Sequence, residues 1–239
     1  MSYDALSRYY DRLMGDFPYE RYLAFIAPRV GEKCLDLACG TGRITCALAR
    51  AGARAHGVDV SEPMLNVAVA SAREQGLTVT FGREDLRRFS LARYDLITCV
   101  SDGLNYVPTK DLAPFFERVA ASLAEGGRCV FDISTPYKLR EVLGDNIYYE
   151  DHEDLTYFWE NKWSERTHSV QLNLTFFERA GDAYVRSNEQ QRMYAHESEA
   201  IGAALDAAGL TAVRIVDGQT FAKRGPKSLR WVFRVEKKR

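Results

Sequence analysis

Short apolar runs alternate with amphipathic stretches through the first 135 residues of the chain. CLDLA (34–38) is an apolar run that ends at glycines, and RITCALARAG (43–52) follows it with helical spacing and a closing glycine. Ser61 and Pro63 mark the start of a second helix, and Gly126 with Gly127 marks the end of a third. The pattern predicts helices at 43–52, 63–75 and 110–124, and strands at 34–38, 55–60, 78–81, 94–100 and 128–134.

Strands separated by helices of this length form βαβ units, whose right-handed crossovers give a parallel sheet covered on both faces. A further helix at 197–208 precedes strands at 212–217 and 229–235, which we expect to close the sheet as a hairpin. The predicted fold is therefore α/β, a Rossmann-like, doubly wound sheet of seven mostly parallel strands.

The hydrophobic period changes to two after Pro136. Alternating segments at 155–163, 168–179 and 183–194 predict antiparallel strands, and the link at 180–182 is a hairpin signal. We interpret residues 148–194 as a small antiparallel β unit inserted into the main domain. That domain then comprises residues 1–147 and 195–239.

The composition is that of a folded protein without a strong charge bias. Of 239 residues, 46% are hydrophobic and 27% are charged, which excludes a disordered chain. The net charge of -1 disfavours a nucleic-acid partner, because domains that bind nucleic acid are typically basic. The sequence contains neither an export signal nor a run of about 18 apolar residues, so we expect a cytoplasmic protein without membrane contact.

The five cysteines favour neither a disulfide framework nor a metal site. Their number is odd, and no two of them have the C-x-x-C spacing that zinc sites use. We expect all five to be reduced and to pack as small hydrophobic residues: Cys34, Cys39, Cys46, Cys99 and Cys129.

The strongest chemical signal is the segment DLACGTG, in which a strand runs into two glycines that open a helix. Gly40 and Gly42 allow a sharp turn and a close approach of the backbone to a ligand, and the helix offers unpaired N–H groups. Asp59 ends the next strand, where a carboxylate can accept hydrogen bonds from both ribose hydroxyls.

A nicotinamide-dependent oxidoreductase shares these features, but two residues argue against it. The third glycine of G-x-G-x-x-G would fall at Thr45. Asp36, just before the turn, would repel a pyrophosphate, whereas it could help to hold a ligand ammonium group.

The motifs DLACGTG, GVDVS, GREDL and YDLITCV resemble the class I S-adenosylmethionine-dependent methyltransferase superfamily over roughly residues 30–135. The resemblance implies an enzyme (EC 2.1.1.-) with S-adenosylmethionine as cofactor, which transfers a methyl group by in-line displacement. It places the methionine end of the cofactor near Ala38, Gly40, Val100 and Ser101. It places the ribose near Asp59 and the adenine near Met64, Asp85 and Leu86.

RYYDRLMGDFPYERY (8–22) is similar to the N-terminal lid helices of a subgroup that includes small-molecule and sugar N-methyltransferases. This likeness implies a helical lid over residues 1–28, with Tyr10 and Tyr19 against the cofactor. An aromatic face near a sulfonium gains cation–π attraction and excludes water. Plain helix packing is the alternative role for the two tyrosines.

The acceptor is open at this point, although a small molecule is favoured. SDGLNY (101–106) lacks the N-P-P-Y pattern of nucleic-acid amino methyltransferases. The aromatic insertion is expected to form an acceptor lid that governs the acceptor and not the cofactor, with a homodimer interface as its alternative role.

Neither a catalytic base nor a metal site is assigned. The candidates for a base are only Asp102, His152, His168 and His196. The alternative functions are an RNA or protein methyltransferase, an NAD-dependent oxidoreductase and a non-catalytic cofactor-binding regulator.

Overall fold

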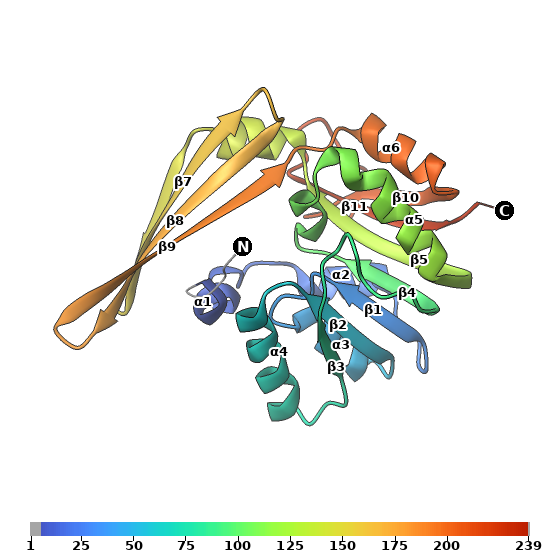
Figure 1. The fold of residues 1–239 in the computed structure, drawn as a ribbon, viewed down its shortest axis with the longest axis horizontal. Helices are drawn as coiled ribbons and strands as arrows, with labels where there is room; N and C mark the ends of the chain where they lie inside the picture. The colour runs from blue at the N-terminus through green and yellow to red at the C-terminus, as the bar shows by residue number, and fades with distance from the viewer. Residues whose placement is uncertain (1–5, 239) are drawn as a thin grey trace.

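A central seven-stranded sheet is built from strands that lie between Lys33 and Ser134 and between Leu210 and Lys237 (Figure 1). The structure, a computed structural model, describes residues 6–238. The sheet has the strand order β10-β11-β5-β4-β1-β2-β3. Its strands are β1 (Lys33–Leu37), β2 (Arg54–Asp59), β3 (Thr80–Arg83), β4 (Tyr94–Cys99), β5 (Leu123–Ser134), β10 (Leu210–Asp217) and β11 (Arg230–Lys237). Strands β1 to β5 are parallel and β11 is antiparallel to both of its neighbours, so the predicted fold is confirmed.

Helices cover both faces of this sheet because successive strand residues point to opposite sides. Cys34 packs on the face covered by α2 (Tyr19–Ile26) and α3 (Arg43–Arg50). Leu35 packs on the face covered by α5 (Leu112–Ser122) and α6 (Ser198–Ala207). Helix α4 (Glu62–Glu74) lies beside β2 and β3, and the side chain of Ser61 caps it as expected, accepting the Met64 amide at 3.3 Å.

The glycine pair at 126–127 does not end a helix, so that prediction was wrong. Helix α5 stops at Ser122, and both glycines lie inside β5. A Cβ on Gly127 would come within 3.1 Å of the Tyr94 carbonyl oxygen, and Gly126 has φ 70°. The pair therefore lets β5 bend closely past β4.

Other differences from the predicted elements are small. The strand expected at 78–81 is observed as β3, two residues later. Three short helical segments were not predicted: the 3₁₀ segments η1 (Gly103–Tyr106) and η2 (Thr109–Asp111), and the π-helix η3 (Lys138–Leu143).

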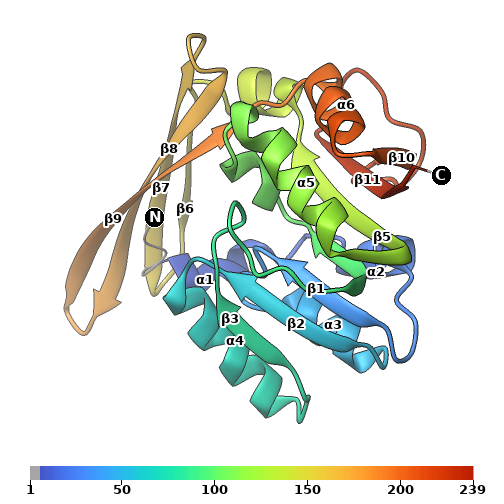
Figure 2. The same ribbon diagram turned by 45° about the vertical axis from the view of Figure 1, so that its right-hand side comes forward.

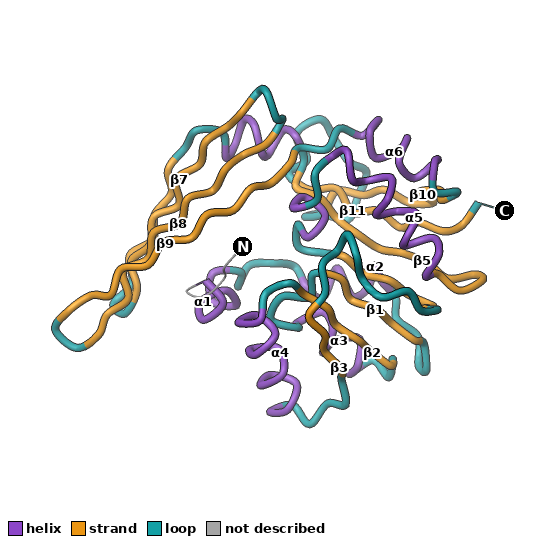
Figure 3. Tube along the Cα trace, viewed as in Figure 1, coloured by secondary structure: helices purple, strands orange, loops and turns teal. Residues whose placement is uncertain are grey.

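The inserted unit is a separate four-stranded antiparallel sheet that projects from the main sheet as long strands (Figure 3). It consists of β6 (Ile147–Asp151), β7 (Leu155–Ser164), β8 (Ser169–Ala180) and β9 (Ala183–Tyr194), in that order. The predicted hairpin joins β8 to β9 through Gly181 and Asp182. Strand β6 had no counterpart among the predicted strands.

Helix α1 (Leu6–Leu13) lies between the inserted sheet and the main domain (Figure 2). Its apolar residues Leu6, Tyr9 and Leu13 pack against a buried cluster of the inserted sheet: Leu155, Tyr157, Leu174 and Phe176. Residues 1–5 of the expected lid lie outside the described residues. None of the helices within residues 6–238 has the length and apolar character needed to cross a membrane.

The five cysteines are free thiols in the structure. Four of them are buried, and Cys39 is half-buried. Burial in an apolar setting raises the pKa of Cys129 to about 12, which keeps that thiol protonated and unreactive.

Candidate functional site

The turn after β1 uses left-handed backbone at three residues: Ala38 (φ 51°), Gly40 (φ 54°) and Gly42 (φ 78°). A Cβ on Gly40 would meet no atom within 4 Å, so the backbone there faces open space. A Cβ on Gly42 would lie 2.9 Å from Ala68 Cβ of α4. Gly40 therefore leaves room for a ligand, whereas Gly42 leaves room for a helix.

Asp36 is buried below this turn. The hydroxyls of Thr45 and Thr98 donate to its two oxygens at 2.6 and 2.7 Å. Burial raises the pKa of Asp36 to about 6. Thr45 packs closely against β2, and this is possible because Gly57 has no side chain. A Cβ on Gly57 would come within 2.8 Å of the Thr45 hydroxyl. The close packing that the third glycine of a dinucleotide motif provides is thus supplied by Gly57 on the next strand.

Asp59 joins the glycine turn to the start of α4. Its Oδ2 accepts the Gly40 amide at 2.9 Å, and its Oδ1 accepts the Ser61 amide at 2.8 Å. Burial raises the pKa of the Asp59 carboxyl. Each carboxylate oxygen can accept a second hydrogen bond, so Asp59 has capacity left for a ligand.

A cavity of about 400 Å³ opens at the carboxyl ends of β1, β2 and β4. Eight of the ten predicted site residues line it: Tyr10, Ala38, Gly40, Asp59, Met64, Asp85, Leu86 and Ser101. Tyr19 and Val100 line a smaller adjoining cavity of about 30 Å³ that shares Tyr10, Ala38, Gly40 and Ser101 with the larger one. The fold therefore brings all ten residues around one continuous region.

Sequence reasoning missed several residues of the same wall. The residues are Leu6, Val60, Glu84, Arg87, Gly103, Tyr106, Val107 and Pro108. Arg192 and Tyr194 of β9 also line the cavity, and they belong to the insertion that was expected to cover the acceptor. Arg87 forms a two-pronged ion pair with Asp85, at 2.6 Å in its shorter contact, and lowers the pKa of that carboxyl.

Helix α1 forms hydrogen bonds to residues around the cavity. The Tyr10 and Ser101 hydroxyls lie 3.2 Å apart, and the Thr41 hydroxyl of the glycine turn donates to Asp11 at 2.7 Å. The Arg43 guanidinium lies 4.0 Å from the centroid of the Tyr19 ring. Burial raises the pKa of Tyr10 well above its usual value, so its hydroxyl stays neutral.

A buried ionic network supports the turn after β4. Ser101 and Asp102 both have left-handed backbone, at φ 65° and 69°, and their amides donate to the two oxygens of Asp132. Arg230 of β11 donates to Asp132 at 3.0 Å and to Asp102 at 2.7 Å. The signal of this network in the sequence was Asp132, because a carboxylate inside the apolar run RCVFDIS needs a buried partner.

Two of the base candidates, Asp102 and His196, are engaged by other groups of the protein. Burial opposes the ionisation of Asp102, yet the Arg230 guanidinium prevails and lowers its pKa to about 2. Burial lowers the pKa of His196 to about 4, and its ring nitrogens contact Thr109 Oγ1 and the Leu104 carbonyl oxygen. These residues hold the surrounding loops in place.

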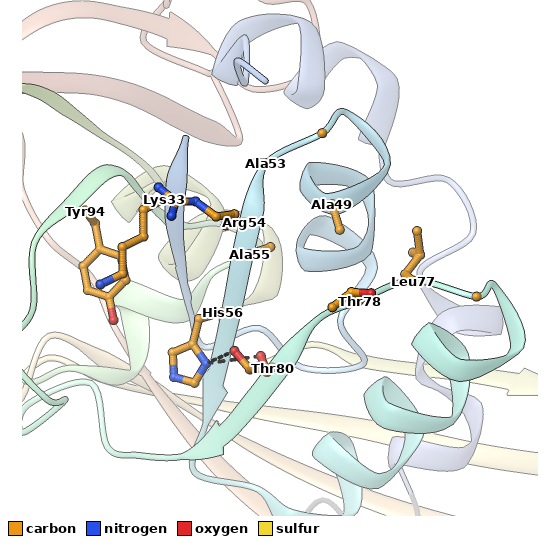
Figure 4. A pocket seen from close by; sticks show the side chains of 12 residues that line it. Lys33, Ala49, Ala53, Arg54, Ala55, His56, Leu77, Thr78, Thr80 and Tyr94 are labelled. Carbon is orange, nitrogen blue, oxygen red and sulfur yellow. Dashed lines mark hydrogen bonds between the residues drawn. The ribbon is translucent and has the colours of Figure 1, made fainter. Parts of the chain in front are cut away.

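A second hollow, of about 660 Å³, lies at the opposite ends of the strands (Figure 4). Lys33, Arg54 and His56 border it, and His56 Nδ1 lies 2.8 Å from Thr80 Oγ1. Open α/β sheets bind ligands at their carboxyl ends, so this hollow is not the candidate cofactor site.

Comparison with known proteins decides the family. A methyltransferase domain family matches residues 34–127. A protein of Geobacillus sp. (strain WCH70) that is classed as a methyltransferase is 32% identical over 90% of this chain and 91% of its own length. This chain belongs to the class I S-adenosylmethionine-dependent methyltransferases. The methyltransferase also matches the crystal structure of an S-adenosylmethionine-dependent methyltransferase from Clostridium acetobutylicum ATCC 824, with 31% identity, 99% of both chains covered and a TM-score of 0.88.

A more distant structural likeness concerns the fold alone. The sugar N-methyltransferase KedS8 from Streptoalloteichus sp. ATCC 53650 is 20% identical to the methyltransferase and has a TM-score of 0.69, with 94% of this chain and 87% of that chain covered.

The cavity of the methyltransferase is compatible with S-adenosylmethionine, the cofactor of its family. The open backbone at Gly40 and the acceptor capacity of Asp59 suit the amino-acid and ribose parts of a nucleoside ligand. Met64, which is 3% exposed, and Leu86 supply an apolar surface for a base.

Proposed function

We propose that this methyltransferase methylates a small organic molecule held beneath α1 and the base of β9. The supporting observation is that the cavity lined by Asp59 and Asp85 is also lined by three tyrosines, Tyr10, Tyr106 and Tyr194. An aromatic lining of this kind is typical of a small-molecule pocket. The fold shared with the sugar N-methyltransferase KedS8 is consistent with such an acceptor.

In the proposed arrangement, Ala38, Gly40, Val100 and Ser101 hold the methionine part of the cofactor. Asp59 binds the ribose, while Met64, Asp85 and Leu86 hold the adenine. Tyr10 and Tyr19 close the site from the lid. When bound, S-adenosylmethionine supplies a methyl group on a positively charged sulfur.

The protein then has two tasks, which are to align the acceptor atom with the methyl group and to exclude water. Displacement at a methyl carbon requires the acceptor atom to lie in line behind it, so positioning is the largest contribution that the protein makes. Helix α1 and the inserted sheet, residues 148–194, cover the acceptor end and keep water away. Neutral Tyr10 contributes an aromatic wall there without adding charge.

Calorimetric titration followed by label transfer tests this proposal. S-Adenosylmethionine and its demethylated product should bind, and NAD should not. Labelled methyl groups should then appear in the small-molecule fraction of a bacterial extract. Transfer to the RNA or protein fraction alone would contradict the small-molecule acceptor, and NAD binding without S-adenosylmethionine binding would contradict the cofactor assignment.

A further inference from the structure

One face of the inserted sheet carries buried polar atoms that have no partner. Trp159 of β7 is paired with Leu174 of β8, and Gln191 of β9 is paired with Leu172, two residues along. Because side chains alternate along a strand, all four point to the same side, which we call the inner face. Trp159 Nε1, Gln191 Nε2 and, further along β7, Trp163 Nε1 are buried donors without an acceptor among residues 6–238.

Such atoms are uncommon because a buried donor without a partner destabilises the folded protein. Five buried polar atoms without a partner among the described residues lie on this one face, and they belong to Trp159, Asn161, Trp163, Ser187 and Gln191. Gln191 is only 5% exposed, so solvent does not compensate its amide. A concentration of this kind indicates a surface that is completed by a ligand.

The inner face adjoins the candidate active site. Tyr106 lines the cavity, and its hydroxyl donates to Gln191 Oε1 at 2.8 Å. Trp159 packs against both the cluster that contains Tyr106 and the cluster that contains Leu6, another residue of the cavity wall. Both contacts connect the inner face with the wall of the cavity.

We propose that Gln191 and Trp159 bind the methyl acceptor by donating hydrogen bonds from Nε2 and Nε1 to its oxygen atoms. The inference rests on the proposed function. Two donors require an acceptor molecule with carbonyl, hydroxyl or carboxylate oxygens. The flat indole of Trp159 adds an apolar surface beside them. Tyr106 holds the Gln191 amide in one orientation, so that its N–H groups point away from the hydroxyl.

Access to these donors requires α1 to move. The helix is held on the inserted sheet by ion pairs from Arg8 to Glu178, at 2.6 Å, and from Arg12 to Asp154, at 3.0 Å. Arg8 and Arg12 are exposed, and ion pairs at such positions contribute little. Binding at Trp159 therefore also requires the apolar residues of α1, Leu6, Tyr9 and Leu13, to move away from the inserted sheet.

The test compares two neighbouring glutamines of β9. Gln191→Glu retains an oxygen for the Tyr106 hydroxyl and removes the donor, whereas Gln191→Met removes both the donor and that oxygen without adding charge. Gln190→Glu is the matched control, because Gln190 is exposed on the opposite face and bonds to Asn173. Each protein is supplied with labelled S-adenosylmethionine and the small-molecule fraction of a bacterial extract.

We expect both Gln191 variants to raise the Michaelis constant for that fraction by about tenfold or more. Calorimetric affinity for S-adenosylhomocysteine should stay within about twofold of the wild type. With S-adenosylhomocysteine bound, the fraction should shift the tryptophan emission of the wild type and of Gln190→Glu, and it should shift that of the Gln191 variants less.

Equal Michaelis constants and equal emission shifts in an active wild type and both Gln191 variants would overturn this inference alone. A wild type that transfers no label to the small-molecule fraction would overturn the proposed function, and this inference with it. A similar rise in the Michaelis constant of Gln190→Glu would also overturn the proposal about Gln191 and Trp159, because the effect would then not be specific to the inner face.

Discussion

At the scale of single residues, the site depends on carboxylates whose surroundings differ. Asp59 accepts two backbone amides and keeps capacity for a ligand, whereas Asp36 receives two threonine hydroxyls inside the protein. Asp102 is neutralised by Arg230. Residue type alone therefore does not assign a role, because the partners of each carboxylate decide what it can bind.

Asp59→Ala should weaken the binding of S-adenosylmethionine by at least about tenfold. Hydrogen bonds between a charged carboxylate and ribose hydroxyls are worth roughly 1.5 to 3 kcal/mol each. Calorimetry measures the affinity, and a thermal melt confirms that the variant is folded. Glu62→Ala, which removes an exposed carboxylate nearby, serves as the control. Unchanged affinity in Asp59→Ala would show that Asp59 only ties Gly40 to Ser61.

Asp36→Asn should change how stability depends on pH. Burial raises the folded-state pKa to about 6, above an unfolded value of about 3.9, so ionisation costs folding free energy in that window. The stability of the wild type relative to Asp36→Asn should fall by roughly 3 kcal/mol as the pH rises from about 4 to 7. Urea denaturation at several pH values measures this difference. A flat difference, like that expected for the exposed control Asp206→Asn, would contradict the prediction.

At the scale of elements, α1 joins two parts of the molecule. Its polar side contacts the glycine turn and the β4 turn through Asp11 and Tyr10, and its apolar side packs on the inserted sheet. Its ion pair from Arg12 to Asp154 is exposed and therefore weak, whereas Arg8 pairs with Glu178, whose side chain is only 16% exposed. This arrangement suits an element that opens and closes over a ligand.

Glu178→Gln should speed tryptic cleavage after Arg8 and Arg12 by about two- to fivefold, because a surface pair contributes up to about 1 kcal/mol to holding the helix. S-Adenosylhomocysteine should slow that cleavage if α1 closes over the cofactor. Timed digestion with mass spectrometry measures both effects. Glu160→Gln, on an exposed position of β7, should cleave like the wild type. Equal rates for all three proteins would show that Glu178 does not hold α1.

At the scale of the whole molecule, residues far apart in sequence stabilise the active-site end of the sheet. Arg230 lies 98 positions from Asp132 and 128 from Asp102, yet the three side chains form one buried cluster. The Tyr22 hydroxyl of α2 donates to the same Asp132 carboxylate at 2.5 Å. The C-terminal hairpin thus fixes the left-handed turn that places Ser101 in the cavity.

Arg230→Met should destabilise the protein by about 3 to 5 kcal/mol, since it leaves two buried carboxylates without their cation. The triple variant Arg230→Met, Asp102→Asn, Asp132→Asn should recover much of that loss. Denaturant unfolding measures both changes. If Arg230→Met costs no more than the substitution Arg234→Met at a half-buried position of the same strand, the network does not support the fold.

Local pattern was sufficient for most elements of the main domain. Hydrophobic periodicity identifies strands β1 to β5. The ten cofactor residues were implied by the resemblance of the local motifs to a family, and they stay a prediction, although they line the two adjoining cavities. The glycine pair at 126–127 was misread because a positive φ serves a bent strand as well as a helix end.

The part of the cavity that we propose for the acceptor was decided by tertiary structure alone. The sequence assigned the insertion to the acceptor and the lid to the cofactor as separate units, but Leu6 and Tyr9 of α1 pack directly on the inserted sheet. Arg230, Tyr106 and Gln191 carry no local motif, and they matter only because strand order and sheet twist bring β11, η1 and β9 to the ends of β1 and β4. Periodicity reports which side of an element is buried, whereas the partner on that side is set by long-range packing.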